Sequence, residues 1–217
     1  MDEKGRALAA HVQFLERNVK ALEELVAKLI RMREEQEQFF SGVFTKSMED
    51  VAAQEDCAPL AQCFTHLADA SKKLAVDTHD VMLKRPEPEI LQTLAQIQDW
   101  GIVPMRRLLE DRDKALKIEY KLQKEYDDKS RVSGAAREKE KKMRMLSDQK
   151  RRVENVNALI DQNMKKFEYF RVSKMKKVMN ELARSQAFHH AKGLEYFAVP
   201  CASVTKLNPG EIADTMP

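Results

Sequence analysis

Apolar residues near the start of the chain recur at alternating intervals of four and three positions. The series is Leu8, Val12, Leu15, Val19, Leu22, Val26 and Leu29. This heptad spacing places the apolar side chains along one face of a long helix. No proline and a single glycine, Gly42, lie between Ala7 and Glu55. The pattern therefore predicts a first helix over residues 5–55.

A second helical pattern begins at Pro59, since proline suits the first turn of a helix. Leu60, Phe64, Leu67, Leu74 and Val81 continue it, and the predicted helix spans about residues 58–131. Two features are expected to interrupt or kink this helix. One is the pair Pro86 and Pro88, and the other is Gly101 followed by Pro104. We expect Trp100 to be packed at this second kink.

The third pattern alternates between three and four positions through Val153, Val156, Ile160, Asn163, Phe167 and Phe170. It predicts a helix over residues 135–198, ending before Pro200. A helix of some 60 residues would be about 90 Å long, at roughly 1.5 Å per residue. Residues 205–217 carry no periodic pattern and are expected to form a flexible tail. We expect residues 1–204 to form one domain.

Composition agrees with helices and disfavours strands. The 217 residues include only 6 glycines and 7 prolines, and 34% are charged. A sheet protein would need more turn residues. Three long helices joined by short turns predict an all-α fold, an elongated antiparallel three-helix coiled coil. Apolar side chains lie on more than one face, as at 143–147 and 167–170, so we expect a second copy to cover them in a homodimer.

Three passages resemble the BAR domain, and among BAR domains the sorting nexin group. They are RMREEQEQFFSGVFTKSMEDVAAQED with LAQCFTHLADASKKL, then LLEDRDKALKIEYKLQKEYDDKSR, and FEYFRVSKMKKVMNELARSQAFHHAKGLEYF. The resemblance implies a curved six-helix dimer that senses or shapes membranes, in which a related BAR protein could replace the second copy. The chain departs from sorting nexins because no PX domain precedes the first helix, and KRPEPE is unusual for the group. Two explanations fit this departure: a BAR-only relative, such as the ciliary BAR proteins that bind Chibby, or a sequence that is a piece of a longer protein.

Charge is distributed unevenly along the chain. Residues 129–177 hold 16 basic and 6 acidic side chains, a net of +10, whereas the whole chain carries +3. Anionic headgroups attract each nearby Lys or Arg by about 1 kcal/mol. The predicted lipid-binding residues are the basic side chains of this block: Lys129, Arg131, Arg137, Lys139, Lys141, Lys142, Arg144, Lys150, Arg151, Arg152, Lys165, Lys166, Arg171, Lys174, Lys176 and Lys177. The resemblance puts the first of them at the tips of the dimer and the others along its concave face.

We therefore predict a peripheral protein that binds anionic phospholipid, including phosphoinositide, and senses or stabilises curvature on endosomal or vesicle membranes. The alternative is a coiled-coil scaffold that recruits protein partners without binding lipid. Nucleic acid would suit the same charge, but residues 129–152 hold no aromatic side chain for base stacking. No motif of an enzyme, no cofactor and no small-molecule substrate is expected. Cys63 and His66 could bind a metal only with further ligands.

The expected compartment is the cytoplasm, with peripheral attachment to membranes. Three cysteines are an odd number, and reducing surroundings explain them most simply. No apolar run approaches the roughly 18 residues of a membrane span. The sequence MDEKGRALAA lacks the apolar stretch of a signal peptide.

Overall fold

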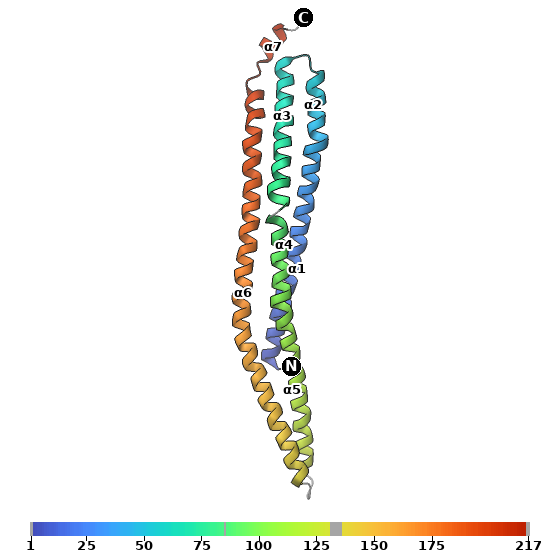
Figure 1. Ribbon diagram of the computed structural model, residues 1–217, viewed down its shortest axis with the longest axis vertical. Coiled ribbons are helices and arrows are strands. Elements are labelled where there is room, and N and C mark those ends of the chain that lie inside the picture. The colour runs from blue at the N-terminus through green and yellow to red at the C-terminus, as the bar shows by residue number, and fades with distance from the viewer. Residues whose placement is uncertain (1, 85, 131–135, 216–217) are drawn as a thin grey trace. The chain divides into compact units, whose positions relative to one another are not determined.

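Figure 1 shows the computed structural model, in which residues 2–84, 86–130 and 136–215 are described. Within these ranges every regular element is a helix and none is a strand, which confirms the all-α prediction. None of their helices is long and apolar enough to cross a bilayer. The chain divides into two compact units, unit 1 with Met1–Leu22 and Leu94–Lys176 and unit 2 with Glu23–Thr93 and Lys177–Pro217. The single domain over residues 1–204 stays a prediction.

The helical elements follow the three predicted patterns with added detail. The first pattern forms α1 (Glu3–Gln38), the π-helical turn η1 (Phe39–Phe44) and α2 (Thr45–Gln54). The second forms α3 (Ala58–Asp77), η2 (Thr78–Leu83), α4 (Pro86–Gln96), η3 (Ile97–Ile102) and α5 (Val103–Ser130). The third forms α6 (Ala136–Thr205), and α7 (Pro209–Thr215) follows it.

In unit 1, α1, α5 and α6 pack along one another, with α5 and α6 antiparallel (Figure 1). The buried apolar side chains come from the predicted seams, among them Val12 and Val19 of α1 and Ile160 and Phe167 of α6. Asp2 accepts hydrogen bonds from Arg112 at 2.6 and 2.8 Å, so α1 begins beside the middle of α5. Asp2 also shares a groove with Asp113, Leu116 and Tyr120 of α5, and the later turns of α5 run beside α6 (Figure 1).

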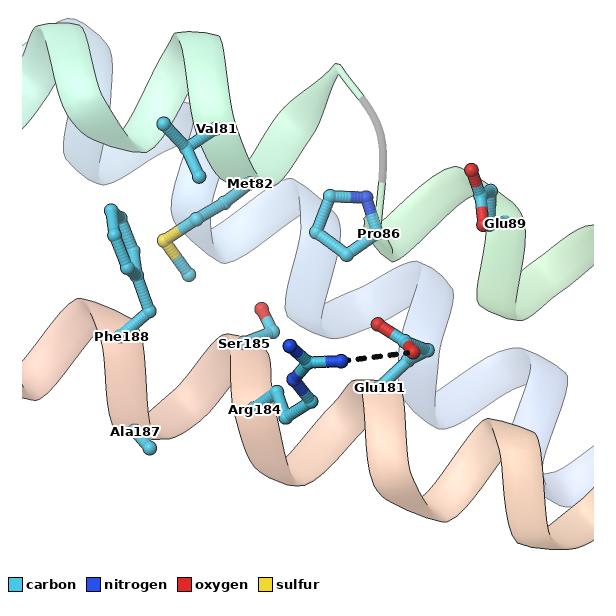
Figure 2. A pocket seen from close by; sticks show the side chains of 9 residues that line it. All are labelled: Val81, Met82, Pro86, Glu89, Glu181, Arg184, Ser185, Ala187 and Phe188. Carbon is cyan, nitrogen blue, oxygen red and sulfur yellow. Dashed lines mark ion pairs between the residues drawn. The ribbon is translucent and has the colours of Figure 1, made fainter.

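In unit 2, the proline pair interrupts the second helical pattern as predicted. η2 ends at Leu83, Lys84 lies in a turn, and α4 begins at Pro86, whose missing N–H costs nothing in a first turn. A groove of about 490 Å³ opens at this break. Figure 2 shows Met82, Ser185 and Phe188 between the segments that line it.

Several sequence expectations differ from the structure. α6 continues to Thr205, past the predicted end near 198, with Pro200 inside the helix. Tertiary contacts support these last turns, since Phe197 lies against Phe40 and Ser203 bonds to His66, so they outweigh the penalty of proline. The predicted tail contains α7, where Asn208 Oδ1 accepts a hydrogen bond from the Gly210 N–H.

The structure also differs from the prediction at the second expected kink. The chain does not break at Pro104 but passes through the π-helical turn η3 into α5. The expectation that Trp100 is packed is wrong, because its side chain is 66% exposed. A π-helical turn holds an extra residue and rotates the positions around it, which turns Trp100 outward.

Gly101 and Gly42 provide a matched pair for a test of packing in η3. A Cβ at Gly101 would lie 2.9 Å from Phe167 Cε2 and 3.2 Å from Cδ2, whereas a Cβ at Gly42 meets nothing within 4 Å. Gly101→Ala is expected to lower the free energy of unfolding by about 1–3 kcal/mol, because the packed ring must move. Gly42→Ala should raise it by roughly 0.5–1 kcal/mol, because alanine restricts the unfolded chain. Urea unfolding measures both, and equal effects would contradict the tight contact at η3.

Candidate functional site

The heptad of α6 separates a core face from a solvent face. Leu146, Val153, Ile160 and Phe167 are buried at intervals of seven and occupy the first heptad position. Eight of the sixteen predicted basic residues fall on positions that point away from this seam. They define the outer basic face, whose members are all exposed: Arg137, Lys141, Arg144, Arg151, Arg152, Lys165, Lys166 and Lys176.

Most cations of the outer basic face have no carboxylate partner. Among the described residues, Arg144 alone of these eight forms an ion pair, with Glu140 at 2.6 Å. The other seven keep their charge free for an external anion. Asp148, also exposed, is an acidic residue on the same side of α6 and reduces the charge locally.

The remaining predicted residues are placed differently. Lys129 and Lys142 are half-buried and pair with Glu138 and Glu125, and these hydrogen bonds hold the pKa of both carboxyl groups below the usual range. Both lysines therefore join α5 to α6 within unit 1. Lys139 and Lys150 are exposed but lie off the outer basic face. Arg131 lies outside the described residues.

Arg171, Lys174 and Lys177 are also engaged within the protein. Arg171 donates to Glu168 at 2.6 Å. Burial of Glu168 raises its pKa, but hydrogen bonds with Arg171 and His11 outweigh this and hold the pKa low. Lys174 donates to Gln96 at 2.7 Å, and Lys177, in unit 2, lies 3.7 Å from Glu89.

The end of unit 1 that holds the last turns of α5 and the first turns of α6 has a small core. Ala115, Leu146 and Val153 are buried there, and the amide of Gln149 donates to the Ala115 carbonyl at 2.8 Å. α5 contributes no net charge to this end, since residues 113–130 hold 5 basic and 5 acidic side chains. The positive charge of this end therefore comes from α6.

Two exposed aromatic residues of unit 1 were missing from the predicted site. Tyr169 is 81% exposed and lies four positions after Lys165, on the same side of α6. Trp100 lines a groove of about 310 Å³ together with Lys166 and Phe170. The heptad in KKFEYF could have indicated Tyr169, because Phe167 and Phe170 take the core positions and Tyr169 falls outside them.

Other features among the described residues are weaker candidates for a functional site. The groove at the proline break is mostly apolar, and its Glu181 and Glu89 are paired with Arg184 and Lys177. His66 Nδ1 lies 2.6 Å from Ser203 Oγ, but that hydroxyl donates to the Val199 carbonyl within its own helix. No group of three or more potential metal ligands occurs among the residues that were described.

Comparison with known proteins gives a likeness in structure and none in sequence. No protein-family model matches the chain, and no curated protein matches its sequence. The N-terminal I-BAR domain of D. discoideum IBARa is similar in structure, with 12% identity and a TM-score of 0.47. The match covers 100% of this chain and 94% of that chain. Membership of the sorting nexin group stays a prediction.

Proposed function

We propose that the chain is a peripheral membrane protein that binds anionic phospholipid through the outer basic face of α6. The single observation that carries this proposal is a set of seven exposed Lys and Arg side chains on one side of α6 that form no ion pair with any described residue. Each contributes about 1 kcal/mol near an anionic surface. Because α6 holds them in a fixed row, they can contact several headgroups at once.

The proposal also includes assembly as a dimer with BAR-like curvature. Leu25, Met32 and Phe39 of unit 2 are exposed at intervals of seven, the spacing with which a further helix packs. A second copy of this chain, or a related BAR protein, would cover them. A curved dimer would favour membranes of matching curvature, and the resemblance to sorting nexins points to endosomal or vesicle membranes.

The second candidate is a scaffold that recruits proteins without binding lipid. The same exposed apolar residues of unit 2 favour it, because they suit a helical partner of any identity. It differs from the first candidate in one respect: the scaffold needs no lipid to act. Neither candidate function includes an enzymatic activity, and we expect none.

Co-sedimentation with vesicles tests the proposal. We expect the bound fraction on phosphatidylserine-containing vesicles to fall steeply as salt rises from about 0.1 M to 1 M, because the Debye length shortens from about 10 Å to 3 Å. Small vesicles should bind more protein than large ones of equal lipid area if curvature is sensed. Failure of a folded protein to bind any anionic vesicle would leave the scaffold as the better account.

A further inference from the structure

The groove between η3, α5 and α6 joins an exposed indole to a lysine of the outer basic face. Trp100, Met105 and Leu108 line it on one side, and Asn163, Lys166 and Phe170 on the other. The lining includes one cation, one amide and no carboxylate. All these residues belong to unit 1.

Local packing explains why Trp100 is exposed. Gly101 has no side chain, so the Phe167 ring of α6 approaches the backbone of η3 at the distance that a Cβ would occupy. Phe167 is buried, and the space beside η3 is thereby filled from α6. The Trp100 side chain lies beside this contact and is 66% exposed.

Beside this groove, the exposed side chains of α6 include aromatic and apolar residues as well as basic ones. From 137 to 152 the outer basic face has no exposed aromatic residue beside it, whereas from 165 to 176 it is accompanied by Tyr169 and Val172, which are 81% and 55% exposed. Trp and Tyr prefer the boundary between headgroups and acyl chains, since each combines an apolar ring with a polar tip. Lysine beside them can pair with a phosphate while its stem follows apolar surface.

We propose that Trp100, Tyr169 and Lys166 form an interfacial anchor that enters the headgroup region of an anionic phospholipid bilayer. This inference rests on the proposed function. It adds which part of unit 1 contacts the bilayer and how deeply that part enters it. The indole reaches the start of the acyl chains, and the Lys166 ammonium pairs with a lipid phosphate at the mouth of the groove. Charge complementarity selects this occupant, because the groove offers a cation and no carboxylate to an amphiphile with an anionic head.

Trp100 is the only tryptophan of the chain, so its own fluorescence reports on the anchor. The protein is mixed with vesicles of phosphatidylcholine and phosphatidylserine, with or without bromine on the acyl chains. We expect the emission to move to shorter wavelength on binding and the brominated lipid to quench most of it. Co-sedimentation of the same samples gives the bound fraction independently.

Variants complete the test. Trp100→Ala should weaken partitioning about tenfold, as expected when an aromatic ring leaves an apolar environment, and Trp100→Phe should weaken it less. Phe14→Ala is the matched control, since Phe14 is 51% exposed on α1, outside the groove, and its loss should leave partitioning unchanged. Circular dichroism verifies that each variant is folded.

The outcomes separate the anchor from the proposed function. Full co-sedimentation with unchanged, unquenched emission would overturn the anchor and leave charge-driven binding intact. Loss of co-sedimentation on every anionic vesicle would overturn both. Equal effects of Trp100→Ala and Phe14→Ala would likewise contradict a specific role for Trp100.

Discussion

A variant in which four basic residues of α6 become glutamine is expected to lose about a thousandfold in its partition coefficient on anionic vesicles. The four are Lys141, Arg151, Arg152 and Lys165, all exposed and without an ion pair among the described residues. Each contributes about 1 kcal/mol near an anionic membrane, and about 1.4 kcal/mol corresponds to a factor of ten. Since none of them supports another side chain through an ion pair, stability should change little. Vesicle co-sedimentation at low salt measures the loss.

A control with the same change in charge distinguishes the face from net charge. Lys28, Lys46, Lys72 and Lys73 are exposed residues of unit 2 on other helices, and their replacement by glutamine also removes four positive charges. We expect this variant to keep most of its binding. If both variants lost affinity equally, binding would follow total charge, and the outer basic face would have no special role.

Glu87→Gln is expected to lower the free energy of unfolding of unit 2 by about 3–5 kcal/mol. Arg33 Nε lies 2.6 Å from Glu87 Oε1, and the two side chains are 4% and 0% exposed. The two side chains therefore form a buried ion pair, and Ser185 donates to the same oxygen at 2.9 Å. Burial lowers the pKa of Arg33, and the Glu87 charge opposes this shift. Neutralising Glu87 therefore leaves a buried cation without its counter-ion.

Two further variants test that explanation by urea unfolding. Glu89→Gln removes an exposed carboxylate 3.7 Å from Lys177, for which a cost of about 0–1 kcal/mol is expected. The double change Arg33→Met with Glu87→Leu removes both buried charges and should recover most of the stability lost by Glu87→Gln. A cost for Glu87→Gln no larger than for Glu89→Gln would contradict the importance of the buried pair.

The helices of this protein could be predicted because their cores follow regular periods. Val153, Ile160 and Phe167 recur every seven residues, and this recurrence alone locates the buried side of α6. The outer basic face follows from the same heptad, since residues between the seam positions must face solvent. The break at Pro86 follows from the covalent structure of proline.

The remaining features depend on contacts between segments distant in sequence. Lys142 looked like a free cation, but its partner Glu125 belongs to another helix. Arg33 interrupted the apolar seam of α1, and only the fold brings Glu87 beside it. The exposure of Trp100 depends on a π-helical turn. The spacing of apolar residues does not predict the extra residue of such a turn.

The most direct test of membrane binding compares the parent chain on two kinds of vesicle at one salt concentration near 0.1 M. One kind is pure phosphatidylcholine, and the other replaces about a third of it with phosphatidylserine. Seven cations on one side of α6, without an ion pair among the described residues, predict a partition coefficient at least about a thousandfold higher on the anionic vesicles. Equal partitioning on both, or none on either by a folded protein, would contradict the account.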